Sequence, residues 1–452
     1  MSKLWKLTDR EGLTFQEKLC CPDKTNARVT PGFLFREKMI EIKKLANGTR
    51  VIFEHMPVGD IISIGIFVKA GSNYENARNN GISHFIEHMV FKGTESKSAK
   101  DIAIMSDRIG GTLNAYTSKD MTCFFIKTTS DNAATALELI SDILLHPAFE
   151  PKTVENEKRV ILEEIAMYED FPEEQVQEQL EKEMWKGNPL SFPIAGSKQT
   201  VMSFTEDTVR NHMNKFYVSA NTVISVSGCF DKKAMFHMIS RYFEDYTSGN
   251  CEASDKGVLA QFRTADVIKT KKIEQAYLSM AFEGCVQDSP ERYPFSVLSG
   301  ILGQSMSSRL FQTVREEKAL AYNIGSFNAS FQTGGILNIY AGCNPERYDD
   351  MMHCIQEIIE DISRNGPEDE EITRARDQIR CSMLLGMETT DSRMISNGRN
   401  MLLRGRPVSR EEAIEKIDKV TKDDVQSIID KYIDWNRKAV SVLRPSKKTK
   451  KS

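Results

Sequence analysis

The chain has 452 residues, which is too long for one hydrophobic core and suits two or three domains. Its 60 lysines and arginines against 64 aspartates and glutamates give a net charge of −4, so no global basic field favours a nucleic-acid partner. Nine cysteines without C-x-x-C spacing predict free thiols, and the lack of an export signal or of a long apolar run predicts a cytoplasmic protein with no membrane span.

The predicted secondary structure becomes regular from about Met39. Two strands are predicted in RVIFEHM and IISIGIFVKA, followed by helices over 80–91 and 99–109. The glycine pair at 110–111 predicts the end of the second helix, because glycine accepts the backbone conformation of a helix C-terminus.

Two more strands are predicted in GTLNAYTS and MTCFFIKT. Asp131 is then expected to cap an apolar-periodic helix that runs to about His146. A long charged helix is expected to begin near Pro151, since proline has no N–H to leave unpaired in a first turn.

The second half repeats this order of elements. A strand AYLSMAF, helices near 290–303 and 307–319, a strand ILNIYAG and a helix from about residue 346 follow one another. An offset of 215 residues superimposes the two series and also brings TVISVSG onto AVSVLRP within a couple of residues. A period of this length predicts duplication of a whole domain.

The mixture of strands and helices without strict β-α-β alternation predicts an α+β fold. We expect two duplicated domains, each a largely antiparallel sheet covered by helices. No G-x-G-x-x-G follows a strand, so a dinucleotide site is not predicted. The predicted parts are an N-terminal extension over 1–38, a first domain over 39–244, a linker over 245–265, a second domain over 266–445 and a basic tail over 446–452.

The segment HFIEHMVFKGT at 84–94 carries the main chemical signal. On a helix, His84 and His88 lie one turn apart with Glu87 beside them on the same face. Two neutral imidazoles can bind one zinc ion, and a catalytic site needs a third protein ligand and a position for water. Glu87 can then accept a proton from the activated water and pass it to a leaving amine, which is amide hydrolysis. Two packed or solvated histidines without a metal remain the alternative at this point.

These residues resemble the inverted-motif zinc peptidases of the pitrilysin, insulinase and mitochondrial processing peptidase family, M16, and the resemblance extends from about residue 40 to 445. In that family a glutamate about 76 residues after the second histidine is the third ligand, and another glutamate lies seven positions before it. ENEKRVILEEIAMYED places Glu164 and Glu157 there, so the resemblance implies Glu164 as ligand and Glu157 as its support. Glu163 is the competing ligand, although only Glu164 shares a helix face with Glu157. Without the upstream motif, this segment would be a solvated charged face.

A second signature lies in SMSSRLFQTVREEKALAYNIGSF. It is similar to the family segment in which an arginine and a tyrosine hold the substrate, which implies that role for Arg315 and Tyr322. A guanidinium and a phenol can position a peptide carbonyl and stabilise its developing charge. An ordinary surface arginine and a half-buried tyrosine are the alternative. Ala319 stands where the family usually has glycine. This departure from the family pattern affects the expected geometry of the loop, not the expected chemistry.

The segment TLNAYTS at 112–118 matches the family's edge strand, to which an extended substrate adds as a further strand. We therefore expect Asn114 and Ala115 to contact substrate, unless they only belong to a well-paired sheet. The 215-residue offset places SGILG and Ile379 opposite the metal motif, so the second half is expected to be degenerate.

The resemblance implies a fold of the LuxS and mitochondrial processing peptidase type and a zinc endopeptidase with one zinc ion per chain. It would cleave peptides or unfolded segments inside a chamber, as a homodimer or as a heterodimer with a related chain, with no nucleic-acid or membrane partner. A non-catalytic scaffold or partner subunit is one alternative. A structural or zinc-buffering protein is another, but it would need four closed ligands and the motif supplies three.

Overall fold

The computed structural model describes residues 40–56, 59–247 and 257–446. The predicted extension of 1–38, residues 248–256 of the predicted linker and all but the first residue of the predicted tail lie outside these ranges. The described residues from Glu41 onward belong to one compact unit. None of their helices is long and apolar enough to cross a membrane.

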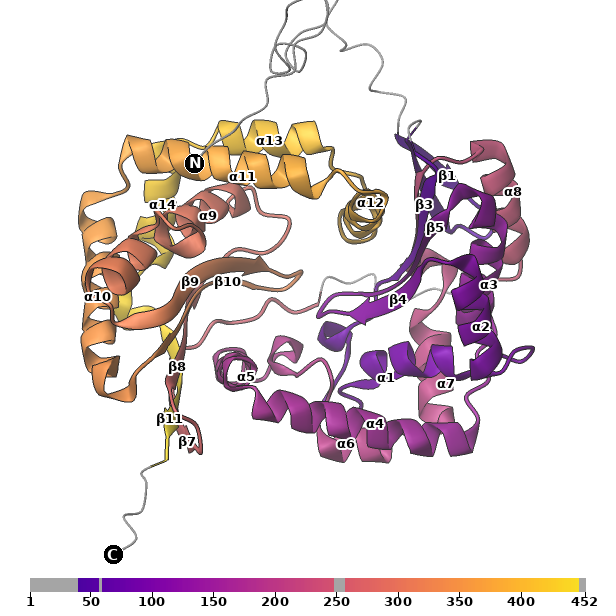
Figure 1. Ribbon diagram of the computed structural model, residues 1–452, viewed down its shortest axis with the longest axis horizontal. Helices are drawn as coiled ribbons and strands as arrows, with labels where there is room; N and C mark the ends of the chain where they lie inside the picture. The colour runs from indigo at the N-terminus through magenta and orange to yellow at the C-terminus, as the bar shows by residue number, and fades with distance from the viewer. Residues whose placement is uncertain (1–39, 57–58, 248–256, 447–452) are drawn as a thin grey trace, which may run out of the picture. The chain divides into compact units, whose positions relative to one another are not determined.

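The first half of the chain contains a six-stranded sheet in the order β1-β2-β6-β3-β5-β4 (Figure 1). The pairs β6–β3, β3–β5 and β5–β4 are antiparallel, and β2–β6 is parallel. The sheet is therefore largely antiparallel, as predicted. β3 is buried along seven of its eight residues, which requires cover on both faces of the sheet. The strands are β1 (Ile40–Lys44), β2 (Arg50–His55), β3 (Ile61–Val68), β4 (Thr112–Thr117), β5 (Thr122–Thr129) and β6 (Thr222–Gly228).

The first half of the chain also contains the helices α1 to α8. Their bounds agree with the predicted ones at α2, which a Ser98 capping box begins and Gly110 ends with φ 65°. The prediction that Asp131 caps α3 is wrong, because Asp131 lies inside a short 3-10 turn and Asn132 occupies the N-cap position, where its side chain accepts no capping hydrogen bond from the helix. The helices are α1 (Ile82–Met89), α2 (Ala99–Ile109), α3 (Ala133–Leu145), α4 (Pro151–Asp170), α5 (Pro172–Met184), α6 (Lys198–Ser203), α7 (Glu206–Phe216) and α8 (Lys232–Tyr242).

The second half contains a five-stranded sheet in the order β7-β11-β8-β10-β9. Its strands are antiparallel except for the pair β7 and β11. The three central strands β11, β8 and β10 were predicted from the sequence, whereas the two edge strands β7 and β9 were not. The strands are β7 (Ala265–Lys271), β8 (Ala276–Glu283), β9 (Ala321–Ser330), β10 (Gly335–Cys343) and β11 (Ala439–Pro445).

Helices of the second half follow the predicted order, with π-helical segments over Gly300–Gln304 and Phe311–Glu317 where longer α-helices were expected. The helices are α9 (Arg292–Ser299), α10 (Tyr348–Asn365), α11 (Asp369–Gly386), α12 (Thr390–Arg404), α13 (Arg410–Asp418) and α14 (Lys422–Tyr432).

Each half lends one helix to the sheet of the other half. α12 lies against β3 and β6 of the first sheet, and α5 lies against β8 and β11 of the second (Figure 1). The Oγ of Ser225 in β6 donates to the carbonyl of Met394 in α12 at 2.9 Å, and the Oγ of Ser279 in β8 donates to Oε1 of Gln177 in α5 at 2.6 Å. The two helices stand at nearly equivalent places in the duplication, so the exchange is reciprocal.

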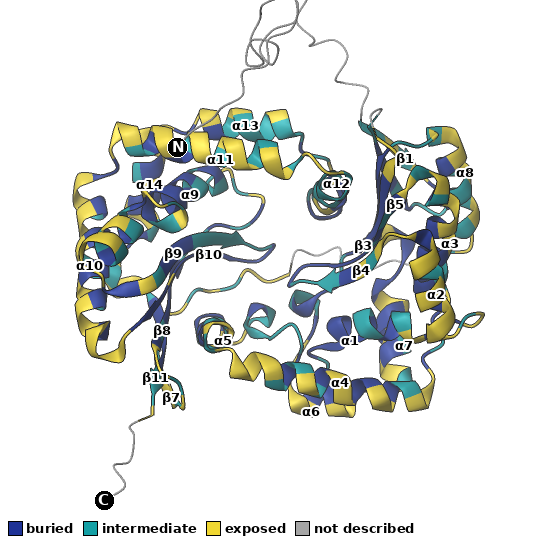
Figure 2. Ribbon diagram, viewed as in Figure 1, coloured by how far each residue is buried: buried dark blue, intermediate teal, exposed yellow. Residues whose placement is uncertain are grey.

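Burial follows this layered arrangement. The central strands of both sheets are largely buried, whereas the helices combine buried and exposed faces (Figure 2). One apolar cluster joins α5 to the second sheet through Leu180, Met184, Ala281 and Ile336. The exchanged helices therefore contribute core residues to the partner half.

Candidate metal centre

The helix α1 begins at a buried carboxylate. Glu75 accepts hydrogen bonds from the backbone N–H groups of Gly81 at 2.7 Å and Ser83 at 2.9 Å, and from the side-chain amide of Asn80 at 3.0 Å. Burial raises the pKa of Glu75 in spite of these bonds. Gly81 has φ 93° and a Cβ there would meet the Cα of Gly196 at 2.6 Å, so the turn into α1 requires glycine. This cap holds the first turn of α1, which otherwise lacks side-chain partners for its N–H groups.

Three side chains converge beside α1. The rings of His84 and His88 are 4.6 Å apart, and Glu164 of α4 lies against both. Nε2 of His84 is 3.7 Å from one carboxylate oxygen of Glu164, and Nε2 of His88 is 3.3 Å from the other. One ligand atom from each lies within 4.8 Å of the other two. Ligands at about 2.0–2.1 Å from a tetrahedral ion are roughly 3.3 Å apart, so this donor set fits zinc after small side-chain shifts.

The choice between the two adjacent glutamates of α4 is resolved by the helix phase. Glu164 faces the histidine pair, whereas Glu163 is exposed on another side of the helix. Tyr168, one turn after Glu164, donates a hydrogen bond from its hydroxyl to Oε1 of Glu164 at 3.1 Å. The carboxylate of Glu164 is therefore oriented from its own helix.

Glu157 holds His88 from the side opposite the cluster. Its Oε1 is 2.9 Å from Nδ1 of His88, and its Oε2 is 2.9 Å from the ammonium of Lys92. Burial would raise the pKa of Glu157, but these two partners lower it overall. A proton on Nδ1 directed at Glu157 leaves Nε2 of His88 facing Glu164, which is the arrangement that orients metal-binding histidines in proteins.

The two histidines differ electrostatically. Burial and the neighbouring charge of His88 lower the pKa of His84 to about 4, which keeps its imidazole neutral. Burial acts in the same direction on His88, but hydrogen bonds to Glu157 and Glu164 outweigh it and raise the pKa of His88 to about 9. Nδ1 of His84 is buried without a hydrogen-bond partner among the described residues.

Glu87 lies beside the cluster without belonging to the three converging groups. The hydroxyl of Thr117, in β4, donates to its Oε2 at 2.5 Å. Burial raises the pKa of Glu87 against the effect of this hydrogen bond. A carboxylate with a raised pKa and a fixed orientation is suited to accept a proton and to return it.

Four residues of this centre were not identified from the sequence: Glu75, Lys92, Thr117 and Tyr168. Lys92 and Tyr168 follow His88 and Glu164 by four positions, so helical spacing could have indicated them. Nothing in the sequence pairs Thr117 with Glu87, because that contact joins a strand to a helix.

The structure places Arg315 and Tyr322 next to each other. The guanidinium of Arg315 lies 4.6 Å from the ring centroid of Phe311 and 5.4 Å from that of Tyr322. Tyr322 is 79% exposed and stands at a β-bulge, where the pairing shifts by one residue between β9 and β10. Among the described residues, no hydrogen bond or ion pair joins either side chain to the histidine pair.

Ala319 adopts the conformation for which glycine is better suited. Its φ of 48° lies in the left-handed region, where a Cβ is unfavourable. The loop before β9 thus has the left-handed backbone conformation typical of glycine, although alanine occupies position 319.

Asn114 and Ala115 lie on β4, which pairs only with β5 in the described sheet and leaves its other edge open. Asn114 is exposed, and its Oδ1 accepts a hydrogen bond from the N–H of Ala115 at 2.8 Å. The predicted edge strand is present, and Thr117 at its end contacts Glu87. An open edge next to the cluster could add a peptide as a further strand.

Comparisons with known proteins cover most of the chain. Residues 50–198 match the family described as insulinase, peptidase family M16, and residues 203–379 match the peptidase M16 inactive domain. The chain is 36% identical over 391 residues to a Bacillus subtilis protein named uncharacterized zinc protease YmxG, covering 86% of this chain and 95% of that protein. It is 34% identical over 389 residues to an uncharacterized zinc protease of Rickettsia felis, covering 85% and 92%.

Solved structures share the fold. A peptidase M16 inactive domain from Pseudomonas fluorescens gives a TM-score of 0.84 at 18% identity and covers 90% of this chain and 98% of its own. A chain of complex III2 from Candida albicans gives 0.78 at 24% identity, covering 90% and 95%. The predicted α+β fold with two duplicated, helix-covered sheets is confirmed. On the family matches and the identity to these relatives, the chain belongs to peptidase family M16.

Proposed function

We propose that this chain is a zinc-dependent endopeptidase that hydrolyses peptides or unfolded protein segments. One zinc ion per chain would be held by His84, His88 and Glu164. The convergence of these three donors within 4.8 Å carries the proposal. Two imidazoles and one carboxylate are a donor set that zinc accepts in catalytic sites, with a further position left open. The Bacillus subtilis and Rickettsia felis relatives are both named zinc proteases, which supports the proposed zinc-dependent hydrolysis.

The proposed chemistry divides between the ion and the chain. Bound zinc would act as a Lewis acid and would lower the pKa of water towards neutrality. Glu87, held by Thr117, would accept the proton of the attacking water and deliver it to the leaving amine. Glu157 would keep Nδ1 of His88 protonated and its ring in place.

Substrate binding would use the remaining predicted residues. The open edge of β4, at Asn114 and Ala115, would pair with the main chain of an extended peptide. Arg315 and Tyr322 would donate hydrogen bonds to the peptide carbonyl on substrate binding. Pairing with a second, identical or related chain, an enclosed chamber and a cytoplasmic location stay predictions, and light scattering of the purified protein would test the pairing.

The decisive variant is Glu87→Gln. It should keep about one zinc per chain while hydrolysis of a quenched peptide falls by about 10²–10⁴-fold, because only the proton carrier is lost. His88→Ala should lose both zinc and activity. Glu163→Gln, an exposed neighbour of the ligand, is the matched control and should keep both.

Two results would contradict this assignment. Loss of zinc from Glu87→Gln would mean that Glu87 is a ligand and that the roles are exchanged. A zinc-loaded unmutated chain that cleaves no member of a diverse peptide library would favour the non-catalytic partner subunit instead.

A further inference from the structure

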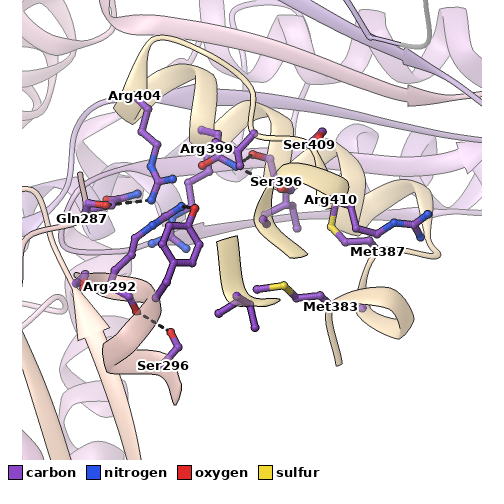
Figure 3. Close-up of a pocket in the computed structure, with 18 of the residues that line it drawn as sticks. Gln287, Arg292, Ser296, Met383, Met387, Ser396, Arg399, Arg404, Ser409 and Arg410 are labelled. Atoms are coloured by element: carbon purple, nitrogen blue, oxygen red, sulfur yellow. Dashed lines mark hydrogen bonds between the residues drawn. The ribbon is translucent and has the colours of Figure 1, made fainter. Parts of the chain in front are cut away.

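A cavity of about 580 Å³ is lined by residues of the second half of the chain, and none of them belongs to the metal centre (Figure 3). Residues of α9, α11, α12, α13 and the edge strand β9 line it. Its volume is in the range of ligand sites in proteins. Four of its lining residues are arginines and none is an aspartate or glutamate: Arg292, Arg399, Arg404 and Arg410.

Three of these arginines are grouped. Arg292, Arg399 and Arg404 lie on one side of the cavity near Gln287, whereas Arg410 extends on the other side (Figure 3). The three come from two helices, α9 and α12, that are more than 90 residues apart in the chain. Like charges gathered in a partly desolvated cavity repel one another, so this arrangement is costly without a counter-charge.

Among the described residues, one ion pair reaches this group of three arginines, between Arg404 and Asp288. Arg292 contacts Tyr293, donating to its hydroxyl and lying 4.4 Å over its ring, and forms no ion pair within the described ranges. Arg399 also has no ion pair there. It acts at a distance on Asp120, whose carboxylate already accepts hydrogen bonds from Asn73 at 2.9 Å and from a backbone N–H at 3.1 Å.

Arg404 shows the same deficit at one atom. A terminal nitrogen of Arg404 donates to the carbonyl of Gln287 at 3.1 Å. Its Nε forms a long ion pair with Asp288 at 3.9 Å, but it is buried without a hydrogen-bond partner among the described residues. Buried donors of a guanidinium are normally satisfied, so this Nε lacks an acceptor that a ligand could provide.

The rest of the lining indicates what kind of anion fits. Apolar side chains, among them Met383, Ile395 and Val408, share the cavity with the amides of Asn328 and Asn400. A second cavity of about 500 Å³ adjoins it, because both are lined by Gln287, Arg292, Tyr293 and Arg404. The second cavity adds three further cations, Arg406, Lys416 and Lys419, and two carboxylates, Asp288 and Asp424, so the combined site carries an excess of positive charge.

We propose that this cavity binds an acidic segment of a peptide, with aspartate or glutamate carboxylates on Arg292, Arg399 and Arg404. Arginine donates paired N–H groups in the geometry of a carboxylate, and such charge-assisted bonds are strong where water is partly excluded. The amides suit a peptide main chain and the apolar groups suit its uncharged side chains, which a small inorganic anion would leave unused. That the peptide is a substrate rests on the proposed function, whereas its binding does not.

The test measures binding without turnover. Two fluorescein-labelled peptides that differ only in three glutamates replaced by glutamines are titrated with the full-length Glu87→Gln chain, and binding is followed by fluorescence anisotropy at fixed ionic strength. The glutamate peptide should bind at least about tenfold more tightly. In Arg292→Gln and in Arg399→Gln, each made in this chain, the preference should fall below about threefold. Arg364→Gln, which removes an exposed arginine of α10 outside the cavity, should leave the preference unchanged.

Three outcomes would overturn the proposal: equal affinities of the two peptides, a preference that survives in both cavity variants, or displacement of the glutamate peptide by inorganic tripolyphosphate at a lower concentration than by unlabelled glutamate peptide. The last would assign the cavity to phosphate anions. Hydrolysis of the glutamine peptide by the unmutated chain is measured separately. A retained glutamate preference in a zinc-loaded unmutated chain that cleaves neither this peptide nor any member of the diverse library would reject the peptidase and keep the acidic-peptide site.

Discussion

At the residue scale, three groups of the metal centre are each positioned by a partner that would not itself touch the ion. Glu157 orients His88, Tyr168 orients Glu164 and Thr117 orients Glu87. Such partners restrict rotamers and select the tautomer or charge state of the group that they hold. Activity should therefore depend on them without a change in the ligand set.

Thr117→Val tests this at Glu87. Valine has the shape of threonine but no donor, so Glu87 would lose its hydrogen bond at 2.5 Å and its fixed orientation. Because a hydrogen bond to a charged group contributes about 1.5–3 kcal/mol, kcat should fall by about 10- to 100-fold with zinc content unchanged. Steady-state kinetics and metal analysis measure the two effects. Thr112→Val, at the exposed start of the same strand, is the control, and an equal kcat in both variants would rule out this role for Thr117.

At the element scale, the packing of α12 on the first sheet is closest at a glycine. A Cβ on Gly398 would lie 2.1 Å from the ring of Phe67 in β3, which is fully buried. Glycine is the poorer helix former, by about 1 kcal/mol relative to alanine, so its presence within α12 is explained by this contact.

Gly398→Ala should therefore destabilise the protein although it raises helix propensity. Overpacking of a dense core costs about 1–3 kcal/mol, which exceeds the gain in propensity at the upper end of that range. Guanidinium unfolding would measure the change in the free energy of unfolding. Gly386→Ala, where a Cβ meets nothing within 4 Å, should be neutral or slightly stabilising. Equal effects of the two substitutions would show that α12 can move away from β3.

At the scale of the whole molecule, the exchanged helices make the two halves interdependent. Arg393 and Asn397 of α12 bind the two carboxylate oxygens of Glu54 in β2 at 2.5 and 2.6 Å. Without α12, the first sheet would expose a buried face that includes Phe67 and this carboxylate. An uncovered apolar face of that kind favours aggregation over folding.

A fragment of residues 40–247 should consequently fail to fold alone and should bind no zinc, even though it contains all three converging donors. Production of residues 257–446 together with it should restore folding and zinc binding, because the second fragment supplies α12. Circular dichroism and metal analysis of both preparations would measure this. A first fragment that unfolds cooperatively and holds one zinc ion by itself would show that the halves are independent domains.

The pattern of the sequence predicted those features that depend on neighbours along the chain. β6 and β11 have the residues that were predicted for them, and the i, i+4 spacing of His84 and His88 predicted their common face. β7 and β9 were missed because edge strands carry exposed and polar residues in place of an apolar run. Spacing taken from the family pointed to Glu164, but the helix phase that separates it from Glu163 came from the structure.

By itself, therefore, the sequence determined the local order: a helix with two imidazoles on one face, a long acidic helix and a repeated series of elements. Local geometry follows from the periods of helix and strand, which depend on a few consecutive residues. Only the tertiary structure decided that α5 and α12 each pack on the sheet of the other half and that Thr117 donates a hydrogen bond to Glu87. It also decided that Arg292, Arg399 and Arg404 line one cavity. These contacts join residues far apart in the chain, and their partners are selected by the packing of whole elements.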